Sequence, residues 1–296
     1  MTGADTGTVI VGVDGSDQSA DALALAVTLA GLLDAHLSPV FVHPYGPFSG
    51  TLSESKYEEL VTELADSVHA QMRALSLPVA DRRLRIVTAR SASAGLQRTA
   101  ESERAVVIVV GGSHRSRLGR VLPGGTAERL LAGAPCPVAI APSGYARDRQ
   151  PPIFVGSAYD ASAEAQAALS WATDLARSAD LRLRLLSVHE RLPPVTVQAA
   201  AELPLAAVDD TLRDELRRRL SEAEATAREG GLEVTGALLE GDPAHALADA
   251  SVHLDLLVLG SRGYGPVGAV LLGSVSSALV RTARCAVVVV PRSAGV

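Results

Sequence analysis

The sequence predicts an α/β protein built from two consecutive doubly wound units. Three observations predict this class. Segments recur along the chain at an almost constant spacing. Short apolar runs alternate with longer amphipathic stretches, which is the pattern of βαβ units around a parallel sheet. The chain is 47% hydrophobic but only 3% aromatic, and aliphatic runs of this kind suit strands that are buried on both faces.

The repeat is clearest in the second and the last strand of each half. Residues 38–43, SPVFVH, recur 146 positions later as residues 184–189, RLLSVH. Residues 134–142, APCPVAIAP, recur 149 positions later as residues 283–291, ARCAVVVVP. Offsets that differ by so little indicate a tandem duplication.

The duplication predicts two domains, residues 1–145 and 151–296. They are joined near residues 143–152, where glycine, charged residues and two prolines continue neither a helix nor a strand. We also expect the last strands of the two halves, residues 137–141 and 286–290, to pair antiparallel, because each would otherwise be an exposed apolar edge. The chain would then be an intramolecular pseudo-dimer, and whole chains could pair further into a homodimer.

Hydrophobic periodicity predicts five strands and four helices in each half. In the first half, strands are expected at residues 8–13, 37–42, 84–88, 106–110 and 137–141, and helices at 17–34, 54–76, 93–103 and 125–133. In the second half, strands are expected at residues 153–159, 182–188, 233–239, 256–260 and 286–290, and helices at 162–178, 205–229, 243–253 and 273–282. Right-handed crossovers between such elements give an open, doubly wound sheet.

Composition excludes several classes of function. The net charge is −6 and no basic stripe is present, which disfavours nucleic-acid binding. The apolar runs are too short for an integral membrane segment, and the N-terminus lacks the parts of a signal peptide. Cys136 and Cys285 fit a reducing compartment and are expected to be buried apolar residues, so we expect a cytoplasmic protein. Lys56 is the only lysine, which excludes a P-loop.

Candidate ligand-binding residues follow the first and fourth strands of each half. In doubly wound sheets, ligands bind at the carboxyl ends of the strands where the strand order reverses. Glycines there permit sharp turns and close approach of a ligand, and the N–H groups that begin the next helix favour anions. In the second half the candidates are Asp160, Gly260, Arg262, Gly263, Gly273 and Ser274.

The first half carries a degraded copy of the same frame: Asp14, Gly111, Gly124 and Gly125. In the ungapped register His114 stands at the second glycine position, and its Cβ cannot adopt a glycine-only conformation without strain. A second register pairs Gly112 with Gly260 and puts Arg115 there instead, but it breaks the match at Cys136. We prefer the first register. Since Arg115, Arg117 and Arg120 make this stretch basic, weaker or altered anion binding stays open for the first half.

These features resemble the universal stress protein family in its tandem-domain form, over nearly the whole chain. The resemblance rests on the Asp14-Gly15-Ser16 turn, the Gly260-x2-Gly263-x9-Gly273-Ser274 frame and the Cys-Pro-Val type of entry into the last strand. It implies a Rossmann-like, adenine nucleotide alpha hydrolase-like fold, with strand order 3-2-1-4-5 in each half. It also implies ATP, usually with Mg²⁺, at the glycine frame.

The family resemblance implies a role for each candidate residue of the second half. Asp160 would contact the adenine, the three glycines Gly260, Gly263 and Gly273 would lie along the ribose and phosphates, and Ser274 would hydrogen-bond phosphate oxygens. Arg262 would screen phosphate charge. Asp160 precedes Ala161 where the family pattern has glycine, so this turn departs slightly from the pattern.

The resemblance implies an ATP-binding, nucleotide-responsive regulator of the stress response that acts on a protein partner. A non-ATP-binding or cyclic-nucleotide-binding member of the family is one alternative, and a slow ATP-cleaving enzyme on the same fold is another. Catalysis has little support, because no Gly-x-Ser-x-Gly motif and no obvious group of metal-binding carboxylates is present. His43 and His189 end matching strands and are expected to be structural, with a ligand-adjacent role as the alternative.

Overall fold

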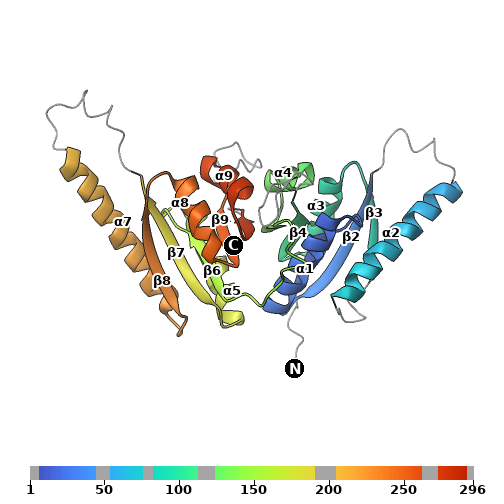
Figure 1. Ribbon diagram of the computed structural model, residues 1–296, viewed down its shortest axis with the longest axis horizontal. Helices are drawn as coiled ribbons and strands as arrows, with labels where there is room; N and C mark the ends of the chain where they lie inside the picture. Colours follow the sequence, from blue (N-terminus) through green and yellow to red (C-terminus); the bar gives the residue numbers. More distant parts are fainter. Residues whose placement is uncertain are drawn as a thin grey trace.

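The computed structural model describes residues 7–44, 54–75, 83–112, 124–190, 205–261 and 273–291. Element labels are those of Figure 1. The first half contains β1 (Thr8–Gly12), α1 (Asp17–Leu32), β2 (His36–Pro44), α2 (Glu54–Ala74), β3 (Arg85–Ala89), α3 (Ala92–Glu103), β4 (Val107–Gly111), α4 (Gly125–Leu131) and β5 (Val138–Ala141). The second half contains β6 (Phe154–Ala158), α5 (Ala163–Ser178), β7 (Arg182–His189), α7 (Leu205–Arg228), β8 (Val234–Glu240), α8 (Pro243–Ala250), the 3₁₀ turn η2 (Ser251–His253), β9 (Leu256–Gly260), α9 (Ser274–Thr282) and β10 (Ala286–Val290).

Every predicted helix and strand is present, with ends within about three residues of the prediction. The largest difference is at residues 243–253, which were predicted as one helix. The α-helix ends at Ala250, and the next turn is 3₁₀, in which the Leu254 N–H donates to the carbonyl of Ser251. The Ser251 hydroxyl donates a hydrogen bond to the carbonyl of Ala248 and accepts one from the Arg284 N–H. This serine therefore holds the tightened turn against the segment before β10.

All ten strands belong to one sheet, in the order β3-β2-β1-β4-β5-β10-β9-β6-β7-β8. Each half therefore has the expected order 3-2-1-4-5, with every neighbour parallel inside the half. The halves meet where β5 and β10 pair antiparallel, with Ala139 opposite Val288. The predicted antiparallel pairing of the last strands is confirmed.

Helices cover both faces of the sheet and create two cores. On one face, α1, α2, α5 and α7 pack on the sheet, and Trp171 of α5 is partly buried there. On the other face, α3, α4, α8 and α9 do so, and this core includes both cysteines. Figure 1 shows α4 and α9 side by side at the centre, where Arg281 Nη2 lies 3.2 Å from Glu128 Oε1, and α2 and α7 at the outer ends. Within the described residues, no helix is both long and apolar enough for a membrane crossing.

The joint between the halves contains neither helix nor strand, as predicted, and it is held by a buried carboxylate. Asp21 of α1 accepts hydrogen bonds from the backbone N–H of Gly144 at 2.8 Å and of Ala146 at 2.9 Å. The Tyr145 ring between them packs against the core. Because a buried carboxylate needs such partners, this contact fixes the path of the joint along α1.

Candidate functional site

The second half has a cavity of about 250 Å³ at the carboxyl ends of β6 and β9. The helices that follow these two strands, α5 and α9, lie on opposite faces of the sheet and leave a crevice between them. Four of the predicted residues line this cavity: Asp160, Gly260, Gly273 and Ser274. Arg262 and Gly263 lie outside the described residues. The structure therefore brings together, from three separate segments, every predicted second-half residue that it describes.

Asp160 is held by the turn that begins α5. Its Oδ1 accepts from the Ser162 N–H at 3.0 Å and from the Ser162 hydroxyl at 2.5 Å. Ser162 in turn caps the helix, because its Oγ accepts from the Ala165 N–H at 3.2 Å. Between them, Ala161 has a φ of 63°, in the left-handed region. The result is an exposed carboxylate whose orientation is set by the helix cap.

Gly260 ends β9 directly against the first turn of α5. A Cβ at this position would lie 2.5 Å from the backbone oxygen of Glu164, so only glycine fits. Its own carbonyl accepts from the Ser276 hydroxyl of α9 at 2.9 Å. Packing of the α5 backbone therefore requires this glycine whether or not a ligand is bound.

Gly273 and Ser274 begin α9. Gly273 is the N-cap, with φ −62° and ψ 162°, and no side chain caps this end of the helix. Ser274 is the first helical residue and is exposed. The first N–H groups of α9 therefore have no side-chain acceptor from the cap position, in contrast to those of α5, and uncapped helix starts favour anions.

The first half has an equivalent cavity of about 330 Å³, lined by all four candidates of that half, Asp14, Gly111, Gly124 and Gly125. Asp14 Oδ1 accepts from the Ser16 N–H at 3.0 Å and from the Ser16 hydroxyl at 2.5 Å, as Asp160 does from Ser162. Gly15 follows it with a φ of 81°. The two aspartate turns are thus the same in both halves.

The preferred register between the two glycine frames agrees with the structure. A Cβ on Gly111 would lie 2.3 Å from the backbone oxygen of Gln18, just as Gly260 abuts Glu164. Gly124 is the N-cap of α4, as Gly273 is the N-cap of α9. Gly111 therefore matches Gly260, and Gly125 stands where the second half has Ser274. His114 lies outside the described residues.

Several lining residues of the second cavity were not identified from the sequence: Tyr159, Glu164, Glu190 and Ser276. Burial raises the pKa of the Tyr159 phenol, and its oxygen accepts from Gln166 Nε2 at 2.6 Å. Glu164 could have been found from the repeat, because Gln18 occupies the same place in α1. Among the described residues, no group of three or more His, Cys, Asp or Glu could hold a metal ion.

His189 and the two cysteines are buried, and none of them lines the candidate cavity. The His189 side chain is 2% exposed, and its Nε2 lies 3.2 Å from Asp209 Oδ1 of α7. It does not line the cavity, although its neighbours Val188 and Glu190 do. Cys136 and Cys285 are free and buried. Burial raises the pKa of the Cys136 thiol to about 12, so this cysteine is protonated and unreactive at neutral pH.

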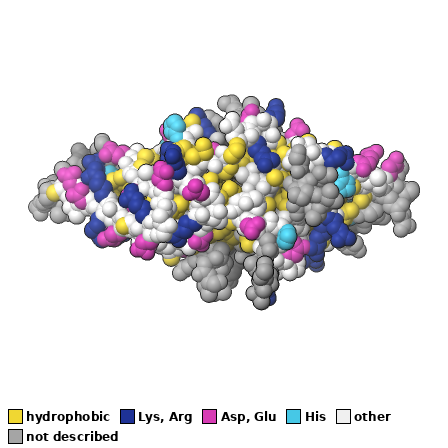
Figure 2. Space-filling view, turned by 90° about the horizontal axis from the view of Figure 1, so that it is seen from below, with side chains coloured by type: hydrophobic (Ala, Val, Ile, Leu, Met, Phe, Trp, Pro, Cys, Tyr) yellow, Lys and Arg dark blue, Asp and Glu magenta, His cyan; other side chains and the backbone are white. Residues whose placement is uncertain are grey.

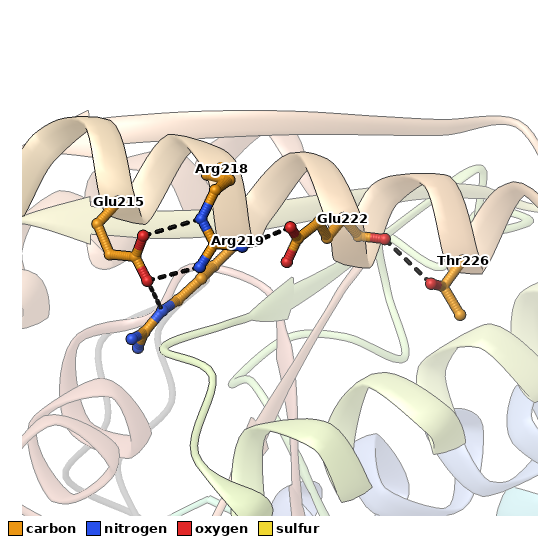
Figure 3. Close-up of polar contacts among 5 residues, drawn as sticks. All are labelled: Glu215, Arg218, Arg219, Glu222 and Thr226. Atoms are coloured by element: carbon orange, nitrogen blue, oxygen red, sulfur yellow. Dashed lines mark hydrogen bonds and ion pairs between the residues drawn. The ribbon is translucent and has the colours of Figure 1, made fainter.

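A larger groove of about 660 Å³ runs between α5 and α7. Its arginines are already paired: Figure 3 shows Arg218 and Arg219 hydrogen-bonded to Glu215, and Arg218 bridged to Glu222. Arg177 on the opposite wall donates to carbonyl groups of Ala227 and Glu229, where α7 ends. The groove contains none of the predicted residues, so its size does not make it the candidate site.

The family model described as the universal stress protein family matches the chain twice, over residues 6–142 and 155–291. The chain belongs to the universal stress protein family. Universal stress proteins of Mycobacterium tuberculosis and Mycobacterium bovis are each 31% identical to it over 299 residues, which is 96% of this chain and 97% of each relative. A universal stress protein of Thermus aquaticus is 33% identical over 141 residues, 45% of this chain and 94% of the relative.

Solved structures show the same fold. A universal stress protein from Archaeoglobus fulgidus has 20% sequence identity and a TM-score of 0.63, covering 96% of this chain and 98% of that one. A universal stress protein from Pseudomonas aeruginosa has 18% identity and a TM-score of 0.63, covering 96% and 92%. The expected Rossmann-like tandem fold is confirmed, and the universal stress protein fold extends over both halves.

Proposed function

We propose that this universal stress protein binds ATP at the second site and acts as a nucleotide-responsive regulator of a stress response. One observation carries the proposal: Asp160, Gly260, Gly273 and Ser274 come from three segments and line one cavity. This cavity lies at the carboxyl ends of parallel strands, where doubly wound sheets bind ligands. Family membership supports the same function.

In the proposed complex, Asp160 faces the adenine, Gly260 and Gly273 lie along the ribose and phosphates, and Ser274 donates to a phosphate oxygen. The uncapped start of α9 supplies further N–H donors. Since the described residues form no metal site of their own, Mg²⁺ would arrive with the nucleotide and be held mainly by its phosphates and water.

We propose binding without turnover, and regulation of a protein partner that reads the ligand state. The two free, buried cysteines suit a reducing compartment, which supports the proposal of a cytoplasmic protein. The first site, with Asp14, Gly111, Gly124 and Gly125, is proposed as a weaker nucleotide site. The rival interpretation is a purely structural one, and it is favoured by the packing of Gly260 and Gly111 against helix backbone.

Isothermal titration with ATP, ADP, AMP and cyclic AMP tests the proposal. The informative variants are Asp160→Ala and Asp160→Asn, since the amide oxygen of asparagine can still accept from Ser162 and keep the turn. We expect Asp160→Ala to weaken ATP binding at least tenfold, equivalent to about 1.4 kcal/mol, while thermal unfolding of Asp160→Asn shows an intact fold.

Two outcomes would contradict the proposal. If the wild-type protein binds none of the four nucleotides, or if Asp160→Ala binds ATP as tightly as the wild type, the second site is not the ATP site. Steady phosphate release from ATP above about 1 s⁻¹, an ordinary rate for an enzyme, would instead favour the catalytic alternative.

A further inference from the structure

The two cavities differ in the charge of their described lining residues. Three acidic residues line the second cavity: Asp160, Glu164 and Glu190. One carboxylate, that of Asp14, lines the first. Neither set of described lining residues includes a lysine, an arginine or a histidine. Among the described lining residues, the difference therefore comes from the acidic residues, of which the first cavity has two fewer.

Glu164 has a precise counterpart in the first half. It is the second residue of α5, and Gln18 is the second residue of α1. The backbone oxygens of both residues abut the glycine that ends the neighbouring strand, at 2.5 Å and 2.3 Å from the Cβ that the glycine lacks. Both side chains are half-buried. Glutamate and glutamine have nearly the same shape, so this position differs between the halves almost only in charge.

A charge here acts on the part of a ligand that lies beside the glycine turn. In the proposed binding mode, that part is the phosphate group. Two unit charges about 4 Å apart in water interact by about 1 kcal/mol. An interaction of this size changes a binding constant several-fold. A neutral nucleoside would not respond to this charge, and each added phosphate charge would increase the response.

We propose that the residue at this helix position, Glu164 in the second half and Gln18 in the first, sets the ligand charge that each site accepts. The second site selects ligands with little net negative charge: a nucleoside, or a nucleotide whose phosphates are neutralised by a divalent cation. At the first site, which we propose as the weaker nucleotide site overall, the neutral Gln18 does not discriminate against the free polyanion. The inference rests on the proposed nucleotide function and defines the ligand class of each site.

The test is a reciprocal exchange, Glu164→Gln and Gln18→Glu, titrated with adenosine, AMP and ATP in the presence of EDTA. In Glu164→Gln, ATP affinity rises about threefold to tenfold, AMP affinity rises less, and adenosine affinity stays the same. Glu164→Asp keeps the charge and retains the wild-type preference. Added Mg²⁺ reduces the difference in ATP affinity between the wild type and Glu164→Gln. In Gln18→Glu, ATP affinity of the first site falls by a similar factor.

Other results overturn the inference. An equal change in adenosine and ATP affinity means that residue 164 acts through packing, and an unchanged ATP affinity in Glu164→Gln means that its charge does not select ligands. In both cases the nucleotide function stands. Absence of binding by the wild type to all three ligands, with and without Mg²⁺, rejects the proposed function itself. If the titration gives one ligand per chain, the Glu164 variants alone decide.

Discussion

Ala161 has a φ of 63° at the place where the matching turn of the first half has Gly15, with a φ of 81°. The left-handed region costs a residue with a Cβ about 1 kcal/mol or more, and glycine pays no such cost. The structure keeps Ala161 there because Asp160 and Ser162 on either side are bonded to each other. The second site is thus built on a turn with local backbone strain.

The substitution Ala161→Gly is expected to raise the free energy of unfolding by about 1 kcal/mol, because it removes this strain. Chemical denaturation measures the change. The reverse substitution in the first half, Gly15→Ala, is the matched control and should destabilise the protein, since its Cβ would also lie 3.0 Å from Leu64. A less stable Ala161→Gly protein would show that the turn is not strained.

At the residue scale, the sequence predicted which residues meet at the second site but not what some of them contact. The spacing of Gly260, Gly273 and Ser274 predicted their approach to one strand end. It could not show that the backbone of Glu164 fills the space that a Cβ of residue 260 would need. Nor could it identify Ser276, since one of three serines at the start of α9 becomes distinctive only when α9 is placed over Gly260.

Among the helices, α7 has the densest ion pairing of the described residues. Arg218 bridges Glu215 and Glu222, and Arg219 Nε donates a third hydrogen bond to Glu215 at 2.6 Å (Figure 3). Figure 2 shows dark blue and magenta side chains interspersed toward the end of the molecule that carries α7, and more hydrophobic side chains near the centre. Pairs at i, i+3 and i, i+4 on an exposed helix stabilise it modestly.

Hydrogen bonds from Arg218 and then Arg219 lower the pKa of the Glu215 carboxyl to about 2. A carboxylate with a lowered pKa in the folded state stabilises the protein above its unfolded pKa, and this contribution is lost as the pH falls from about 4.5 to about 2. We therefore expect Glu215→Gln to lower the melting temperature slightly at pH 7, and the difference from wild type to disappear toward pH 2 and in high salt.

Thermal melts of wild type and Glu215→Gln across this pH range check the expectation. Asp210→Asn, which removes an exposed charge of α7 outside the network, is the control. A difference that stays constant from pH 7 to pH 2 would mean that the side chain acts through helix propensity and not through its charge.

At the element scale, the periodicity predicted α7 over residues 205–229 almost as observed, because amphipathic spacing and charge pairing both extend over its length. The sequence did not predict that α8 would end at Ala250. That end depends on the Ser251 hydroxyl, which accepts a hydrogen bond from the backbone N–H of Arg284, a residue 33 positions away. Local patterns carry no information about such a contact.

For the whole molecule, the joint between the halves depends on Asp21. In Asp21→Ala, the N–H groups of Gly144 and Ala146 lose their acceptor, which should cost about 2 kcal/mol of unfolding free energy. The exposed Arg147 and Arg149 in the same segment should then be cut faster by trypsin. Asp21→Asn keeps one acceptor oxygen and should be intermediate. Equal cleavage rates in all three proteins would show that the carboxylate does not hold the joint.

The sheet as a whole was largely predictable, because a repeated order of apolar and amphipathic segments predicts a repeated topology, and two apolar last strands favour pairing with each other. The contact of Asp21 with the joint was not predictable. An aspartate in the first turns of a helix normally reads as an exposed helix-start residue, and only the path of a segment more than 120 positions later buries it.

Antiparallel pairing of β5 with β10 relates the halves as a twofold axis relates the copies in a homodimer. Identical subunits must carry every substitution twice, once in each site. Here each half is encoded separately. The first half can therefore have Gln18 and Gly125 at the positions where the second half has Glu164 and Ser274. Dilution cannot separate the two sites or exchange their partners. The duplication therefore joins two non-identical sites permanently in one chain. One site can change during evolution while the other is kept.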